Sequence, residues 1–104
     1  MRPLILGYLR VRIGTSLATV ARARQSLVDL ALREGYTLGE VFVEADENRS
    51  CAALVDVIEA ARNGRVAAVA VPSGEHLGRF RAAQVGLRQR VEREAGVPVL
   101  VAVP

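Results

Sequence analysis

Short apolar runs alternate with longer segments of helical spacing along the chain. Residues 3–11, PLILGYLRV, form the first apolar run, which predicts a strand covered on both faces. Residues 17–34 repeat apolar side chains at helical spacing, which predicts a helix capped by Thr15 or Ser16 and ended by Gly35. Its predicted inner face consists of Leu17, Val20, Ala21, Leu27, Leu30 and Ala31.

The same alternation continues through the rest of the sequence. Three further apolar runs predict strands: TLGEVFVEA at 37–45, RVAAVAVP at 65–72 and VPVLVAV at 97–103. Helices are predicted over residues 51–63 and 77–95, and the predicted inner face of the second consists of Phe80, Ala83, Leu87 and Val91. The order β-α-β-α-β-α-β predicts an α/β fold, a three-layer α/β/α sandwich with a mainly parallel four-stranded sheet.

Length and composition fit one small globular domain. The 104 residues can bury a single core, and 51% of them are apolar, but no apolar run approaches the roughly 20 residues of a membrane-spanning helix. The N-terminus lacks a signal-peptide pattern, and a single cysteine, Cys51, excludes an internal disulfide. We therefore predict a cytoplasmic protein with no membrane partner.

The charge pattern permits a nucleic-acid partner without requiring one. The net charge is +3, and all 14 basic residues are arginines, the side chain best shaped to pair with phosphate. The sequence contains neither a GxxxxGK[ST] phosphate loop nor a GxGxxG motif after the first strand. It has one histidine and one cysteine, with no ligand-type residues at metal spacing. We expect no cofactor and no metal.

Polar side chains gather where the predicted strands end. In parallel sheets, ligands bind at the carboxyl ends of the strands. We predict an anion-binding crevice there, because planar guanidinium groups pair well with phosphate oxygens. Its predicted anion-binding residues are Arg10, Arg12, Arg79 and His76, with Asp46 and Glu75 as supporting acidic residues.

Two other interpretations of these residues stay open. One is purely structural: ion pairs join the strand-end arginines to the acidic residues Asp46, Glu44 or Glu75. The other is nucleophilic: Ser73 stands close before His76, as a serine and imidazole pair would require. Against it, Ser-Gly dipeptides such as the one at Ser73 are typical of turns.

Five sequence pieces, in this order and spacing, carry a resemblance to a known family. They are GYLRV, LREGY, VFVEAD, LVDVIEAARNGRVAAVAV and EHLGR. Over nearly its whole length the chain resembles the N-terminal catalytic domain of the serine recombinases, the resolvase and invertase family. The resemblance implies a resolvase-like fold. In that family a serine after the first strand attacks a DNA phosphodiester, and several arginines bind the scissile phosphate.

The chain departs from the family pattern at the residues that carry the chemistry. Arg10 matches the strand arginine, but Arg12 stands where the nucleophilic serine is expected. Glu75 and His76 replace the aspartate and first arginine of the Asp-Arg-Leu-x-Arg segment, of which the leucine and Arg79 remain. We therefore predict a catalytically inactive member. The alternative is an active DNA strand transferase in which a displaced Ser16, or Thr15, supplies the hydroxyl.

These observations lead to one functional hypothesis with a small set of partners. We expect residues 1–104 to form a single resolvase-like domain that lacks the family's long dimer helix and helix-turn-helix module. The hypothesis is a binding or assembly module related to site-specific DNA recombination. Its predicted partners are DNA or a recombinase-family protein, bound weakly and without sequence specificity, and a second copy paired along an exposed sheet edge. A small-anion-binding protein is the remaining alternative.

Overall fold

The computed structural model describes residues 1–45 and 51–103, and in this part strands and helices alternate as predicted. The elements are β1 (Leu4–Val11), α1 (Leu17–Glu34), β2 (Thr37–Ala45), α2 (Ala52–Asn63), β3 (Val66–Val71), the 3₁₀ turn η1 (Gly74–His76), α3 (Arg81–Ala95) and β4 (Val99–Val101). Ser16 caps α1 and Gly35 ends it in the left-handed conformation, as the sequence predicts.

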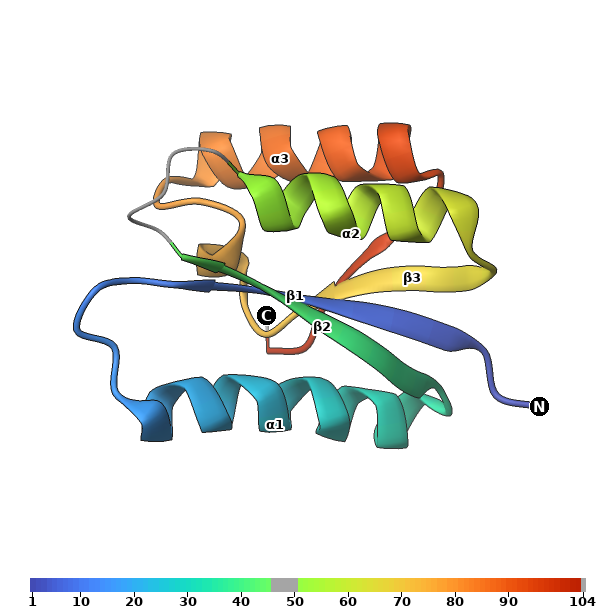
Figure 1. Ribbon diagram of the computed structural model, residues 1–104, viewed down its shortest axis with the longest axis horizontal. Helices are drawn as coiled ribbons and strands as arrows, with labels where there is room; N and C mark the ends of the chain where they lie inside the picture. The colour runs from blue at the N-terminus through green and yellow to red at the C-terminus, as the bar shows by residue number, and fades with distance from the viewer. Residues whose placement is uncertain (46–50, 104) are drawn as a thin grey trace.

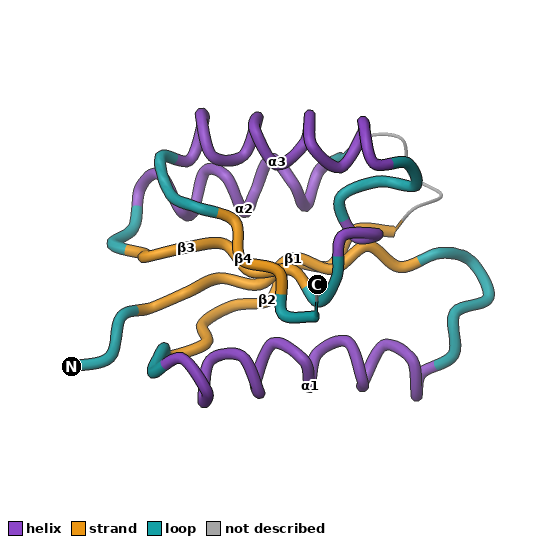
Figure 2. Tube along the Cα trace, turned by 180° about the vertical axis from the view of Figure 1, so that it is seen from behind, coloured by secondary structure: helices purple, strands orange, loops and turns teal. Residues whose placement is uncertain are grey.

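The four strands form one parallel sheet in the order β2-β1-β3-β4. Helix α1 covers one face of the sheet, and α2 and α3 cover the other (Figure 1). The predicted three-layer α/β/α sandwich is therefore confirmed, with a sheet that is parallel at every described pairing. The loop after β1 and the turn η1 after β3 lie at the same end of the sheet (Figure 2).

Alternation along β1 divides the core into two halves. Ile5 and Leu9 pack against α1, whereas Leu6 and Tyr8 face α2 and α3. Between them, Gly7 lets the layers approach closely, because a Cβ there would lie 2.7 Å from the side chain of Leu27. The same alternation continues to the end of β1, so side chains that are adjacent in sequence point to opposite faces of the sheet.

Two predicted helix faces are wrong in detail. Leu17 and Ala21 of α1 are exposed, the former by 88%, whereas Val20 and Ala23 of the same turns pack against the core. In the third helix, Phe80 is 75% exposed and Ala83 is exposed as well. That helix begins at Arg81, because the preceding segment forms η1 and then turns at buried Gly78, whose carbonyl accepts a hydrogen bond from Gln84 Nε2 at 3.0 Å.

The edge strand β4 is held by side chains of α3. The backbone N–H of Val99 donates to Glu92 Oε2 at 2.9 Å, and its carbonyl accepts from Arg88 Nη2 at 2.9 Å. The two side chains also pair with each other, with 3.7 Å between Arg88 Nε and Glu92 Oε2. The predicted edge is present, but both backbone groups of Val99 are already hydrogen-bonded. The edge therefore offers less unpaired backbone to a second copy than the sequence suggests.

Candidate functional site

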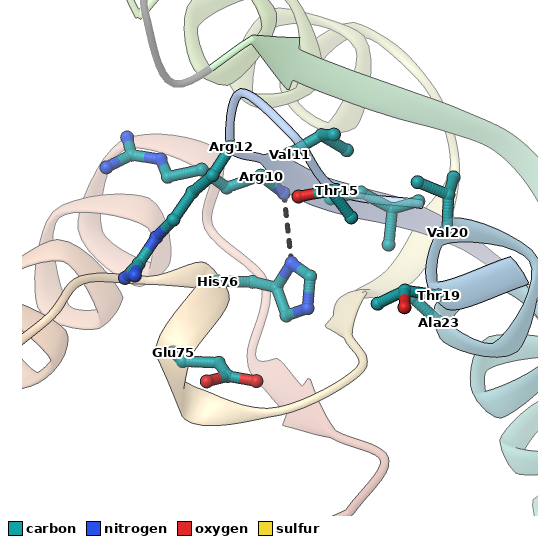
Figure 3. Close-up of a pocket in the computed structure, with 10 residues that line it drawn as sticks. Arg10, Val11, Arg12, Thr15, Thr19, Val20, Ala23, Glu75 and His76 are labelled. Carbon is teal, nitrogen blue, oxygen red and sulfur yellow. Dashed lines mark hydrogen bonds between the residues drawn. The ribbon is translucent and has the colours of Figure 1, made fainter. Parts of the chain in front are cut away.

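A cavity of about 170 Å³ lies at the carboxyl end of β1. Its walls come from the end of β1, the following loop, the first turns of α1, and η1 (Figure 3). The lining residues are Leu9, Arg10, Val11, Arg12, Thr15, Thr19, Val20, Ala23, Glu75 and His76. The cavity thus opens on the α1 side of the strand end, where an apolar interior meets a polar rim.

The loop between β1 and α1 is fixed by local hydrogen bonds. The N–H of Thr15 donates to the carbonyl of Arg12 at 3.1 Å, and Gly14 has a φ of 83°, as in a type II turn. Ser16 Oγ accepts from the N–H of Thr19 at 3.1 Å and lies 2.9 Å from the hydroxyl of Thr19. The Ser16 hydroxyl therefore acts as a helix cap, and its side chain is exposed on the surface.

His76 joins η1 to the end of β1. Its Nδ1 accepts a hydrogen bond from the backbone N–H of Arg10 at 3.0 Å (Figure 3). An imidazolium carries a proton on both nitrogens and could not accept this bond, so the contact belongs to the neutral ring with its proton on Nε2. Burial lowers the pKa of His76, and the nearby charge of Glu75 opposes this effect.

The guanidinium of Arg10 lies on the other side of the strand, under the start of α2. Its Nη2 is 3.4 Å from the hydroxyl of Tyr8 and 4.0 Å from Cys51 Sγ. Burial raises the pKa of Tyr8, and the cation of Arg10 limits the rise. In Figure 3 the Arg10 side chain runs away from His76, so this cation and the cavity lie on different faces of β1.

Glu44 lies near Arg10 at the start of α2 and was not among the predicted site residues. The register of β1 and β2 pairs it with Arg10, and its side chain is only 4% exposed. Its Oε1 accepts the N–H of Leu54 at 3.1 Å, in the first turn of α2. The N-cap residue Cys51 makes no side-chain cap bond, so Glu44 stabilises this helix end from a neighbouring strand. A carboxylate inside the apolar run VFVEA is the sequence signal for such a role.

The structure brings together some of the predicted anion-binding residues and separates others. Arg12, His76 and Glu75 surround one cavity, and Arg12 extends from the strand end toward η1 (Figure 3). Arg10 adds its backbone to that cavity, while Arg79 is exposed and is not among its lining residues. Asp46, and Arg49 of the same loop, lie outside the described residues. The roles of these residues in anion binding stay predictions.

The two candidate serine nucleophiles are both engaged in local hydrogen bonds. Ser16 caps α1, as described above, and Ser73 Oγ donates to Glu75 Oε1 at 3.3 Å. Among the hydrogen bonds of the described residues, His76 Nδ1 is bonded to Arg10 rather than to Ser73. The alternative in which Ser73 and His76 form a nucleophilic pair therefore has no direct hydrogen bond between them among the described residues.

Two further searches cover residues 1–45 and 51–103. No three His, Cys, Asp or Glu side chains in this part are grouped so that they could hold a metal ion. No helix within it combines the length and apolar character that crossing a bilayer demands.

Solved structures with a similar fold are catalytic domains of serine recombinases. The C-terminal catalytic domain of ISC1926 TnpA, an IS607-like serine recombinase, has a TM-score of 0.76 and 20% identity, covering 97% of this chain and 70% of that chain. The N-terminal catalytic domain of TP901-1 integrase has a TM-score of 0.71 and 19% identity, covering 95% of this chain and 76% of that one. The C-terminal catalytic domain of IS1535 TnpA, also IS607-like, has a TM-score of 0.72 and 18% identity, with coverage of 95% and 71%.

Comparison by sequence found no match, either to a protein-family model or to a curated protein. The fold comparison nevertheless agrees with the resemblance read from the sequence. The described part of the chain has the serine recombinase catalytic-domain fold.

Proposed function

We propose that this chain is a serine-recombinase-like domain that does not cut DNA and acts as a binding or assembly module in DNA recombination. The proposal rests on the end of β1, where the sequence resemblance aligns Arg12 with the family's nucleophilic serine and where Arg12 lines a cavity with His76 and Glu75. A guanidinium cannot attack phosphorus, so residue 12 itself does not supply a nucleophile for the step that would form a covalent link to DNA.

The positions of the neighbouring hydroxyls support the same proposal. Ser16 would have to leave its N-cap bond to act as a nucleophile, and Ser73 would have to leave Glu75. The Arg10 guanidinium meets Tyr8 and Cys51 on the opposite face of β1 from Ser16, which weakens the case for a shared active site. Loss of both nucleophile and charge stabilisation would cost phosphoryl transfer many orders of magnitude.

The candidate surface for an acidic partner is smaller than the run of arginines in the last helix suggests. Arg88 and Arg90 are hydrogen-bonded within the fold, to Val99 and Glu94 respectively. Arg79 and Arg81 are exposed and flank the exposed Phe80 at the start of α3. We propose that the start of α3 contacts DNA. Binding there is weak and independent of the DNA sequence, because only a few phosphates are contacted.

The remaining parts of the proposal concern organisation. We propose a single 104-residue domain with a cytoplasmic location, and DNA or a recombinase-family protein as its partner. Pairing of two copies is the least supported element, because the α3 side chains already bond the β4 edge at Val99. Light scattering at high protein concentration measures this directly, and a monomer throughout would remove the homodimer from the proposal.

Covalent trapping tests the absence of catalysis. The protein is incubated with supercoiled plasmid and with fragmented genomic DNA, quenched in denaturing detergent, and analysed for protein attached to DNA. We expect no covalent product from the wild-type chain, from Ser16→Ala or from Ser73→Ala. A product present with the wild type and absent with Ser16→Ala would overturn the proposal in favour of the displaced-serine alternative.

A further inference from the structure

The cavity beside β1 has the composition of a small-molecule site. Its interior is lined by the apolar side chains of Leu9, Val11, Val20 and Ala23. Its rim carries two threonine hydroxyls, an imidazole, a guanidinium and a carboxylate, supplied by Thr15, Thr19, His76, Arg12 and Glu75. Concave apolar sites with a few convergent polar groups are typical of ligand pockets.

His76 presents a fixed hydrogen-bond donor to this cavity. Because its Nδ1 accepts the N–H of Arg10, the proton of the neutral ring resides on Nε2. Figure 3 shows the Nε2 side of the ring facing the gap toward Thr19 and Ala23 of α1. The backbone bond thus orients the imidazole, as outer hydrogen bonds orient ligand-binding histidines in other sites. Burial, which lowers the pKa of His76, keeps the ring in this neutral form near pH 7.

The size of the cavity limits its occupant. Its volume is about 170 Å³. An apolar cavity of about 150 Å³ is large enough for a benzene molecule in another protein. A ligand of about six to nine non-hydrogen atoms would therefore fit, whereas a nucleotide would not.

We propose that this cavity binds a small organic carboxylate with an apolar body. The body lies against Leu9, Val20 and Ala23, and the carboxylate accepts the Nε2 hydrogen of His76. Arg12 adds a positive charge to the rim of the cavity. Figure 3 shows its guanidinium on the opposite side of His76 from Nε2, so we assign the direct contact with the carboxylate to His76 alone. The charge of Glu75 acts on His76 and repels the ligand's carboxylate, and a hydrogen bond from Ser73 to Glu75 partly offsets this repulsion.

This site is separate from the phosphate-binding role predicted for the Arg10 guanidinium and does not depend on the proposed function. It uses the backbone of Arg10, whose guanidinium lies on the other face of the strand. A domain that never meets DNA could still bind such a ligand, and a DNA-binding domain could lack it.

Binding of four probes to the full chain tests the proposal. Benzoate combines both features, toluene carries only the apolar body, benzamide replaces the carboxylate by a neutral amide, and inorganic phosphate carries only the charge. Backbone amide shifts in ¹⁵N-labelled protein report the site of binding. We expect benzoate to bind in the millimolar range or tighter and to shift the amides of Leu9, Thr19 and Ala23. Benzamide and toluene should bind at least about tenfold more weakly, since the charge-assisted bond is lost.

Matched variants separate the pocket from the general surface. Ala23→Leu fills the cavity from within α1 and should abolish benzoate binding while the protein stays folded. Ala82→Leu makes the same change on the exposed face of α3 and should bind like the wild type. His76→Asn keeps an acceptor near the Nδ1 position, but its shorter amide places no donor where Nε2 lies, so it should weaken benzoate binding about tenfold without affecting toluene.

Three results would overturn the proposal. They are no amide shifts with benzoate at ten millimolar, shifts of equal size in the wild type and Ala23→Leu, and phosphate binding in the same place as tightly as benzoate. The last result would identify a site for inorganic anions instead of an organic carboxylate.

Discussion

Several charged side chains in this domain make contacts within the protein that hold its elements together. Arg10 is predicted from the sequence resemblance to bind phosphate, yet its guanidinium lies beside Tyr8 and Cys51 beneath α2. Its cross-strand partner Glu44 is buried and accepts the N–H of Leu54. The two side chains together position the start of α2.

Removing the Glu44 carboxylate should destabilise the protein. Glu44→Ala leaves the N–H of Leu54 without its acceptor, and we expect the free energy of unfolding to fall by about 1–3 kcal/mol. Glu44→Gln keeps an oxygen in reach and should lose less than half as much. Urea unfolding measures both values, with Glu40→Ala on the exposed side of β2 as the control, expected within about 0.5 kcal/mol of the wild type. Equal losses for Glu44→Ala and Glu40→Ala would refute this role.

The single histidine should make stability depend on pH. Burial lowers the pKa of His76 in the folded protein, so in acid the unfolded chain binds a proton that the folded chain resists. The part of the free energy of unfolding that depends on a neutral His76 is therefore fully present above the unfolded pKa of about 6.5. It is lost as the pH falls from there toward the folded pKa. His76→Asn should abolish this part of the dependence. Unfolding at a series of pH values from 7.5 to 5 compares the two proteins, and parallel curves would contradict the prediction.

At the scale of elements, the prediction succeeded where periodic packing decides the structure. The strands, α1 and α2 follow from apolar spacing, and the apolar residues of α2 that are spaced i, i+3, i+4 and i+7 are all buried: Leu54, Val57, Ile58 and Ala61. The start of α3 failed, because Leu77 continues the apolar pattern while Gly78 turns the chain and leaves Phe80 outside. Spacing alone does not distinguish a 3₁₀ turn followed by a loop from the first turn of a helix.

The candidate site shows the same limit. Topology correctly predicted that Arg12 and His76 meet at one end of the sheet, because parallel strands end together. The prediction grouped the Arg10 guanidinium with the cavity, although alternation along β1 places it on the face of Tyr8, and it missed that His76 is bonded to a backbone N–H. Those features depend on side-chain direction and on a single hydrogen bond between residues far apart in sequence.

The bonds between α3 and β4 give a prediction at this scale. Glu92→Ala removes the acceptor of the Val99 N–H and the partner of Arg88, so it should lower the free energy of unfolding by about 1–2 kcal/mol. It should also raise self-association at high concentration, because the edge backbone becomes available. Glu94→Ala is the control, since it breaks an ion pair on the same helix without touching the strand. Urea unfolding and light scattering distinguish them, and equal behaviour would refute the edge-protecting role.

Across the whole molecule, arginines connect elements through backbone carbonyls. Arg33 at the end of α1 approaches the carbonyl of Ala102 at 3.5 Å, and Arg62 at the end of α2 donates to the carbonyl of Glu94 at 3.1 Å. Arg88 joins α3 to β4 in the same way. A planar guanidinium with several donors suits such contacts better than an ammonium group. The excess of arginine and the net charge of +3 therefore overstate the surface available to DNA.

This distribution of charge predicts weak DNA binding that falls steeply with salt. Contacts to two or three phosphates from the start of α3 would weaken about 10- to 40-fold between 50 and 200 mM salt, whatever the DNA sequence. Arg79→Gln and Arg81→Gln should each reduce the salt dependence by about one phosphate contact, whereas Arg24→Gln, on the exposed surface of α1, should leave it unchanged. Fluorescence anisotropy with two unrelated duplexes measures these slopes. Nanomolar binding to one duplex alone would instead require base contacts, which two exposed arginines at one helix start do not supply.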